Sequence, residues 1–388
     1  MADSKEDKLT DLLAIEEAQR ELEFQVNKRN NQKKENHYEF NMTPKELYSY
    51  LSESVIGQQE AKQKLSTAVC YHYQNLSTNG HERRSSTHKN NVLLIGPTGC
   101  GKTYLVQKIA QVVNVPLLIA DATRFSGTGY VGDNVDSLVH DLVLKSNGDF
   151  NVASKGIIYL DEIDKIAISS GQGRDVSGRD VQVGLLGIIE GGSEAKINFR
   201  GSERSIKTDD ILFICGGAFS NLYSSLRGNH VVDPHKKSEF DDGEYLHNIE
   251  IPQLIESLKK YGMMPELLGR IPVLARLRSL NQDDLKRILI ESSDSVIKKY
   301  QKDFASYGIT ANFLESAYDS IASKAYHRNM GARGLGAVVE ESLTPLKFHL
   351  PGTGIDYVEI TSETIDNSLE NTLKVIENFK TKLGEVKQ

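Results

Sequence analysis

The stretch NVLLIGPTGCGKTYLVQKIAQVV, residues 91–113, decides the fold of this chain. It begins with an apolar run typical of a buried strand, continues with a glycine-rich loop and ends with a segment that favours a helix. The loop, GPTGCGKT, has the spacing G-x-x-x-x-G-K-T, in which backbone N–H groups at the start of a helix surround phosphate groups. The sequence therefore predicts a strand, loop and helix that bind the phosphates of a nucleotide.

The residues of this loop have separate expected roles. The glycines let the backbone close around the phosphates, Lys102 reaches the β and γ phosphate oxygens, and the Thr103 hydroxyl ligates Mg²⁺. We assign no chemistry to the Cys100 side chain, although its backbone belongs to the loop. The residues predicted to contact the nucleotide here are Gly96, Pro97, Thr98, Gly99, Cys100, Gly101, Lys102, Thr103 and Tyr104.

A second segment, GIIYLDEIDK at residues 156–165, joins a buried strand to two carboxylates. Asp161 and Glu162 end the strand, and the carboxyl ends of strands line the crevice in which α/β sheets bind ligands. Such a pair is commonly a solvated turn, but its position about 60 residues after the phosphate loop favours a catalytic role. We expect Asp161 to help hold Mg²⁺ and Glu162 to orient and deprotonate the attacking water.

The composition excludes several classes of protein. The chain has 388 residues, 39% of them hydrophobic and 26% charged, which predicts a globular protein of two domains. Its net charge of −7 argues against nucleic acid as a partner. Cys70, Cys100 and Cys215 are widely spaced and indicate neither a disulfide framework nor a cysteine zinc site. No apolar run approaches the roughly 18 residues of a membrane span, so we expect a cytoplasmic protein with no membrane partner.

Three regions follow one another along the chain. Residues 1–40 are highly charged with leucines at helical spacing, and fit either a solvated extension or a helix that binds an adaptor or another copy. Residues 41–276 begin near a capping box at Thr43 and alternate apolar runs with helical segments, which predicts an α/β domain with a parallel sheet flanked by helices. Residues 277–388 form a smaller, mostly helical domain, with residues 357–360 as an isolated strand. The apolar runs of the sheet are VLLIG, VPLLIA, GIIYL and ILFICGG.

Further motifs occur in a fixed order: VIGQQEAK at residues 55–62, PELLGRIPV at 265–273 and GARGLG at 331–336. Together with the phosphate loop and the acidic strand end, they resemble the AAA+ ATPases, and among them the Clp and HslU group of ring unfoldases that includes ClpX. The resemblance runs from about Thr43 to Gly336 and beyond. It implies an AAA+ P-loop domain followed by a smaller helical domain, hydrolysis of ATP with Mg²⁺, and a homohexameric ring.

The same resemblance implies roles for individual residues. Val55 and Ile56 contact the adenine, and residues 211–219 form the strand that carries the first sensor. Arg270 is an arginine finger that reaches the nucleotide of the neighbouring subunit, a device that raises the rate of phosphoryl transfer by about 10³ to 10⁵. Arg333 is a second sensor on the helical domain.

Two segments resemble loops that line the central pore of such rings. In TGYVGD, residues 128–133, the resemblance implies that Tyr130 and Val131 grip a polypeptide, because an aromatic ring offers a large contact area and the flanking glycines let the loop swing. The alternative is a tyrosine packed beneath a surface loop. Residues 173–192 resemble a second pore loop with its following helix, for which an exposed, salt-bridged loop is the alternative. The second loop's predicted contact residues are Arg174, Asp175, Val176 and Ser177.

The chain departs from the ClpX pattern in three places. Residues 1–40 contain no cysteine pairs like those of the ClpX zinc module, so recruitment of substrates or adaptors must differ. Residues 227–251, RGNHVVDPHKKSEFDDGEYLHNIEI, lack the Ile/Leu-Gly-Phe tripeptide that docks on the ClpP peptidase, so we do not expect docking on ClpP in the usual way. Gly336 stands where relatives often have arginine.

The sequence thus predicts an ATP-dependent protein unfoldase or remodeller that threads polypeptide through a ring. One alternative is the unfoldase component of an ATP-dependent protease complex. A second is a nucleic-acid motor. Its only support is the basic segment HERRSSTHKN at residues 81–90, which a solvated loop explains as well. A third is a scaffold that binds ATP without turnover, against which intact Lys102, Asp161, Glu162 and Arg270 weigh.

Overall fold

The computed structural model describes residues 40–77, 89–125, 135–168, 176–192, 194–199, 202–220, 222 and 249–385, and the statements below concern these residues. Several predicted functional residues lie outside them, namely Tyr130, Val131, Arg174 and Asp175. Nearly all of the predicted extension 1–40 lies outside them too.

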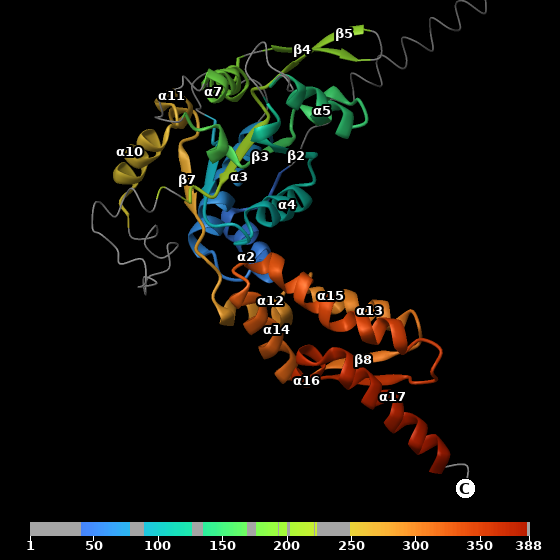
Figure 1. The fold of residues 1–388 in the computed structure, drawn as a ribbon. Coiled ribbons are helices and arrows are strands. Elements are labelled where there is room, and N and C mark those ends of the chain that lie inside the picture. The colour runs from blue at the N-terminus through green and yellow to red at the C-terminus, as the bar shows by residue number, and fades with distance from the viewer. Residues whose placement is uncertain are drawn as a thin grey trace, which may run out of the picture. The chain divides into compact units, whose positions relative to one another are not determined.

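The first part of the described chain alternates helices and strands (Figure 1). Its elements are α2 (Pro44–Ser54), α3 (Gln59–Ser77), β1 (Val92–Ile95), α4 (Lys102–Val113), β2 (Leu117–Asp121), η1 (Ala122–Arg124), α5 (Ser137–Lys145), α6 (Phe150–Ala153), β3 (Ile157–Asp161), η2 (Ile163–Ile166), α7 (Val176–Ile189), β4 (Glu194–Phe199), β5 (Ser202–Lys207), β6 (Leu212–Gly217), α10 (Ile251–Tyr261), α11 (Pro265–Gly269) and β7 (Val273–Arg276). The predicted capping box is confirmed, because the Thr43 side chain and the Glu46 side chain each accept from the other residue's backbone N–H at the start of α2.

Five of these strands form one parallel sheet in the order β2-β3-β6-β1-β7. Four of them are the predicted apolar runs, which confirms the α/β prediction. The fifth, β7, pairs beside β1 with Val273 opposite Val92, and we did not predict it as a strand. Because β6 lies between β1 and β3, the segments that follow β1 and β3 emerge at the same edge of the sheet, one strand apart.

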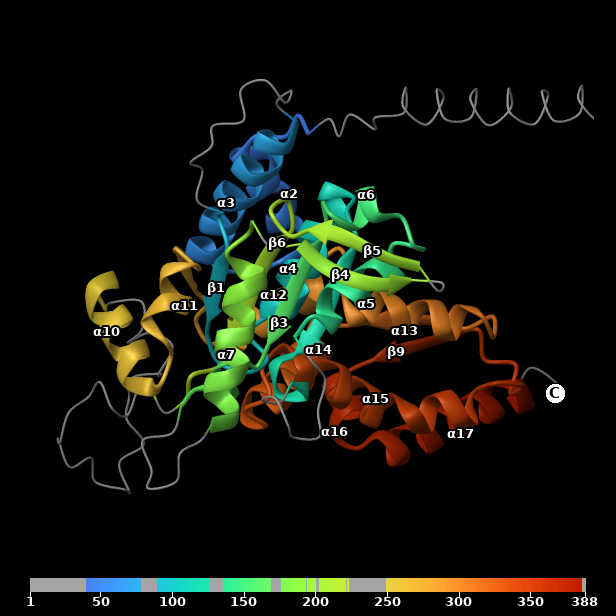
Figure 2. The same ribbon diagram turned by 90° about the horizontal axis from the view of Figure 1, so that it is seen from above.

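The sheet is buried on both faces, as its apolar runs predict. Residues of one face, including Leu93, Ile95 and Phe213, share a core with α5, α7 and α10. Figure 2 shows α7 in front of the sheet, between β1 and β3. On the other face α4 contacts β3 and β6. Burying a side chain of leucine size stabilises the fold by roughly 1.5 to 3 kcal/mol, so both faces contribute to holding the sheet and its covering helices together.

A separate antiparallel hairpin, β4 and β5, precedes β6 and was not predicted. Its pattern is the alternation of a half-buried strand: Ala195 and Ile197 are buried on β4, and Ile206 is buried opposite Ala195 on β5. Figure 1 shows the hairpin beyond the sheet, near α5.

The last part of the described chain is a helical region with its own hydrophobic core. Two predictions are corrected here. The strand at 357–360 is not isolated, because it pairs in parallel with residues 310–313. Ala311–Phe313 therefore belong to a strand, whereas the segment ANFLESAYDSIASKAYHR at residues 311–328 reads as a helix throughout. The reason is the alternating burial of both segments, which a helix could not provide. The elements are α12 (Gln282–Glu291), α13 (Val296–Ala305), β8 (Thr310–Phe313), α14 (Glu315–His327), α15 (Ala332–His349), β9 (Tyr357–Ile360), α16 (Ser362–Asp366) and α17 (Ser368–Glu385).

Contacts divide the chain into a large compact unit and a small one made of Met1–Asn41 with Tyr73–Arg83. In the described part of the small unit, the Phe40 N–H donates to Ser77 Oγ at 3.0 Å, and the rings of Phe40 and Tyr73 lie 5.8 Å apart. The sheet, the helical region and every site residue discussed below belong to the large unit. Among the described residues, no helix is both long enough and apolar enough to cross a membrane.

Candidate nucleotide site

The glycine-rich loop lies between β1 and α4, as predicted. Gly99 and Gly101 have φ angles of +79° and +101°, which glycine adopts without strain, and Gly101 is the residue from which α4 begins. The Lys102 side chain is buried and its Nζ donates to the carbonyls of Gly96 at 2.6 Å and Pro97 at 3.0 Å. The loop therefore curls around its own lysine, which places a positive charge inside it.

Asp161 joins the end of β3 to the start of α4. Its Oδ2 accepts from the Thr103 hydroxyl at 2.8 Å, and its Oδ1 accepts from the Tyr159 hydroxyl at 3.1 Å. Burial and the nearby Asp161 carboxylate raise the pKa of Tyr159, so the phenol stays protonated and remains a donor. A threonine hydroxyl beside a carboxylate offers the oxygen ligands that Mg²⁺ prefers. These residues fit the predicted metal site, and Tyr159 is a supporting residue that the sequence analysis missed.

Glu162 has an unusual backbone. Its φ of +57° and ψ of +33° lie in the left-handed region, which costs a residue other than glycine roughly 1 to 2 kcal/mol. The Glu162 N–H donates to Asp161 Oδ1 at 3.0 Å, and its side chain is exposed. Strained residues of this kind persist where the surrounding structure fixes them, and they cluster at active sites. The carboxylate is thus presented to solvent at the sheet edge where the phosphate loop begins.

A buried aspartate, Asp164, binds the backbone at the end of the neighbouring strand β6. Asp164 is 5% exposed and accepts from the backbone N–H groups of Ala218 at 3.2 Å and Phe219 at 3.3 Å. These two residues directly follow β6, the strand predicted to carry the first sensor. The sequence analysis missed Asp164, although the pattern D-E-I-D places a second aspartate one turn after Asp161.

The predicted adenine contacts, Val55 and Ile56, are buried at the end of α2, and their contact with a base stays a prediction. Tyr104, predicted to contact the nucleotide, donates its hydroxyl to Asp294 Oδ2 at 3.1 Å. Lys108 forms an ion pair with the same carboxylate. Asp294 lies between α12 and α13, so α4 is tied to the helical region.

The structure brings the GARGLG motif to the phosphate loop. The Ala332 N–H donates to the Gly99 carbonyl at 3.0 Å. The approach leaves no room for side chains, since a Cβ added to Gly99 would lie 2.2 Å from the Met330 oxygen and one added to Gly331 would lie 2.5 Å from the Gly99 oxygen. Arg333 follows in the first turn of α15 and is exposed.

Arg270, in contrast, lies away from the phosphate loop of its own chain. Its carbonyl accepts from Asn91 Nδ2 at 2.9 Å, and Asn91 precedes β1, whereas the loop begins after β1 at Gly96. The four residues of β1 lie between Asn91 and Gly96, so five steps of roughly 3.3 Å place the two residues about 16 Å apart. The Arg270 guanidinium forms an ion pair with Glu190 at the end of α7.

Comparisons with known proteins agree with this arrangement. Residues 87–274 match the model of the AAA domain (Cdc48 subfamily), and residues 280–347 match that of the C-terminal, D2-small domain of ClpB protein. The ATP-dependent Clp protease ATP-binding subunit ClpX of Borrelia duttonii is 40% identical over 342 residues, which cover 84% of this chain and 79% of the relative. The protein of the same name from Treponema denticola is 40% identical over 344 residues, 84% of this chain and 82% of the relative. The predicted resemblance is confirmed, and the chain belongs to the ClpX family of AAA ATPases.

Proposed function

We propose that this ATPase is a protein unfoldase or remodeller, in which ATP hydrolysis at the joint between neighbouring protomers moves polypeptide through the pore of a homohexamer. The observation that carries the proposal is the position of Arg270. An arginine at the amino-terminal end of β7 cannot serve the phosphate loop at the carboxyl end of the adjacent β1, so a catalytic role requires a second protomer. Such a head-to-tail contact generates a closed ring when the rotation between successive protomers returns to the first, and we propose that it does so here.

The nucleotide chemistry follows from the residues at the sheet edge. Thr103 and Asp161 would hold Mg²⁺, which neutralises charge on the phosphates when it is bound. Lys102 holds its ammonium group inside the loop, where it binds phosphate oxygens, and Glu162 accepts a proton from the attacking water. Arg333, at the start of α15, adds positive charge from the helical domain. The proposed boundary between the two domains, after residue 276, coincides with the end of β7.

The joint between protomers is testable by mixing two inactive variants. Arg270→Ala removes the finger but keeps Glu162, and Glu162→Gln removes the base but keeps the finger. In a mixed ring, some interfaces combine an intact finger with an intact base, so ATPase activity should return on mixing. An Arg270→Ala variant that retains full activity by itself, or a mixture that stays as inactive as its components, contradicts the proposal.

Polypeptide translocation is proposed for the two pore segments. Tyr130, Val131, Arg174 and Asp175 lie outside the described residues, and Val176 and Ser177 form the start of α7. Tyr130→Ala should spare ATPase activity and slow the unfolding of a tagged, folded protein, because an aromatic ring supplies most of the nonspecific grip. Equal unfolding rates for the two proteins would end this part of the proposal.

The relatives named above are called protease subunits, which favours the alternative that this chain also feeds a peptidase. We nevertheless propose that it does not dock on ClpP in the usual way, because the sequence of residues 227–251 lacks the docking tripeptide. We also propose that residues 1–40 bind an adaptor. Co-elution of the assembled ring with ClpP, together with ATP-stimulated degradation of an unfolded protein, would establish the alternative.

A further inference from the structure

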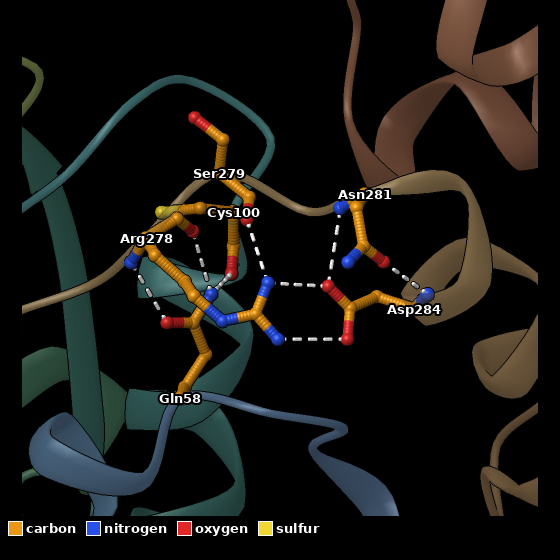
Figure 3. Close-up of polar contacts among 6 residues, drawn as sticks. All are labelled: Gln58, Cys100, Arg278, Ser279, Asn281 and Asp284. Carbon is orange, nitrogen blue, oxygen red and sulfur yellow. Dashed lines mark hydrogen bonds and ion pairs between the residues drawn. The ribbon is translucent and has the colours of Figure 1, made fainter. Parts of the chain in front are cut away.

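One buried glutamine connects the phosphate loop to the linker that leads into the helical region (Figure 3). Gln58 is 2% exposed, and its amide is fully engaged. Its Nε2 donates to the carbonyl of Cys100 at 3.2 Å and to the carbonyl of Arg278 at 2.9 Å, while its Oε1 accepts from the Arg278 N–H at 2.9 Å. Cys100 belongs to the loop that surrounds the phosphates, and Arg278 lies between β7 and α12.

The connection continues from the linker into the first helix of the helical region. The Arg278 guanidinium donates to both carboxylate oxygens of Asp284 and to the carbonyl of Ser279, as the dashed lines in Figure 3 show. Asp284 in turn forms a reciprocal capping box with Asn281 at the start of α12. Burial opposes ionisation of Asp284, but hydrogen bonds from Arg278 and Asn281 outweigh it and hold its pKa below the ordinary value.

The backbone before Gln58 is shaped to permit this contact. Gly57 and Gln58 both have left-handed φ angles, +69° and +55°. A Cβ added to Gly57 would lie 3.0 Å from Nη2 of Arg278, so a larger residue would push the guanidinium aside. Gln58 is therefore held in one orientation between two polar backbone segments that are 178 positions apart in the chain, Cys100 and Arg278.

We propose that Gln58 is a positioning residue that transmits the state of the phosphate loop to the linker at residues 277–281 and so sets the orientation of the helical domain that carries Arg333. A primary amide is planar, so a shift of the Cys100 carbonyl on nucleotide binding must either tilt the Gln58 amide or break its bond. Tilting the amide displaces both backbone groups of Arg278. The Arg278 guanidinium then carries the displacement to Asp284 and α12.

The chemistry of an amide explains the choice of residue. The site needs two donors and one acceptor at the end of a side chain of fixed length. Glutamate has the length but cannot donate to the two carbonyls when ionised, and methionine has a similar length with neither strong donors nor a strong acceptor. Gln58→Met therefore removes the connection with little change in volume, and it is the variant of choice.

The test compares Gln58→Met with Gln59→Met, a matched control at the neighbouring exposed glutamine. Nucleotide-dependent domain orientation is read from the distance between spin labels on Gln107→Cys in α4 and Tyr326→Cys in α14, both exposed positions. The three native cysteines are buried, so the label reacts with the two introduced cysteines. Steady-state ATPase measurements without polypeptide give kcat and KM for ATP for the unlabelled variants.

We expect the wild-type chain and Gln59→Met to show a distance that differs between the ADP and ATPγS states. In Gln58→Met, that difference should disappear and kcat should fall about 10- to 100-fold with KM changed less than about twofold, because a misplacement of about 1 Å that arises far from the chemistry can cost about 10²-fold. A merely structural role predicts a lowered melting temperature with an unchanged nucleotide-dependent distance, and this result overturns the proposal. Unchanged kcat and unchanged distances in Gln58→Met overturn it as well.

Should Gln58→Met fail to fold, Arg278→Lys tests the same path, because it keeps the backbone bonds to Gln58 and loses the two-pronged pairing with Asp284. In Arg278→Lys, too, the distance between the labels should no longer differ between the ADP and ATPγS states. A distance that still changes with nucleotide contradicts the proposal. The inference rests on the nucleotide site of the proposed function but not on threading. Failure of Tyr130→Ala to slow unfolding would therefore leave these measurements intact.

Discussion

Replacing Gly331 by alanine should separate α15 from the phosphate loop. Gly331 directly precedes α15 with φ of +56° and ψ of −146°, a combination that only glycine adopts readily. A Cβ at this position would lie 2.5 Å from the Gly99 carbonyl oxygen, a distance at which backbone atoms must move apart. Gly336 offers the matched control on the same helix, because a Cβ added there meets nothing within 4 Å.

The cost can be estimated from two contributions. Forcing alanine into this backbone conformation costs about 1 to 3 kcal/mol. Losing the hydrogen bond from the Ala332 N–H to the Gly99 carbonyl destabilises the contact by about 0.5 to 1.5 kcal/mol more. The junction should therefore weaken by about 1.5 to 4.5 kcal/mol. Gly336→Ala, in contrast, should stabilise the helix by about 0.5 to 1 kcal/mol because glycine loses more backbone freedom on folding.

Hydrogen exchange at the Ala332 amide measures this junction directly, because that N–H is the donor to Gly99. At about 1.36 kcal/mol per tenfold change, exchange in Gly331→Ala should be roughly 10- to 2,000-fold faster, up to the rate of an unprotected amide. Gly336→Ala should leave it unchanged. The helical region has its own core, so the loss should be local and amides inside α14 should keep their protection. Equal exchange at Ala332 in the two variants would refute the argument from close approach.

Three further predictions concern chemistry and pH. Glu162→Gln should still bind ATP while turnover falls by about 10² to 10⁴, the usual contribution of a general base, as measured by nucleotide titration and steady-state ATPase assay. Tyr159→Phe removes a donor to Asp161 and should raise the Mg²⁺ concentration for half-maximal activity by about 10- to 100-fold, with an unchanged requirement contradicting the assigned support. Burial lowers the pKa of His72 from 6.5 to about 4, so the unfolded chain binds a proton in this interval that the folded chain does not. Stability should therefore drop as pH falls from 6.5 to 4, by up to about 3 kcal/mol in urea unfolding, and His72→Asn should flatten this dependence.

The sheet edge that forms the candidate site could be predicted because its determinants are local. Apolar runs specify buried strands, and the spacing of the glycines specifies the loop, without knowledge of partners elsewhere. β7 was missed because it is four residues long and directly follows Pro272, a residue that argues against a strand interior. The hairpin β4-β5 could have been found, since residues 194–199 alternate polar and apolar side chains.

The supporting residues could not be predicted in the same way. Gln58 and Arg278 are 220 positions apart, and nothing in either segment says that an amide of one meets the backbone of the other. Asp164 resembles any acidic residue after a strand until its two backbone donors are seen. Burial of a polar side chain is the property that marks Gln58 and Asp164, and burial is a consequence of the assembled fold.

Two hydrogen bonds from different parts of the chain converge on adjacent peptide groups of the phosphate loop. Gln58, which is bonded to the linker, donates to the Cys100 carbonyl, and Ala332 of α15 donates to the Gly99 carbonyl. The loop thus contacts the helical region through the linker that enters it and through a helix inside it. A change in the orientation of the helical region must strain at least one of these bonds. Coupling between sites is reciprocal, so a partner that binds one orientation of the helical region would change the affinity for nucleotide by the same factor by which nucleotide changes the affinity for that partner.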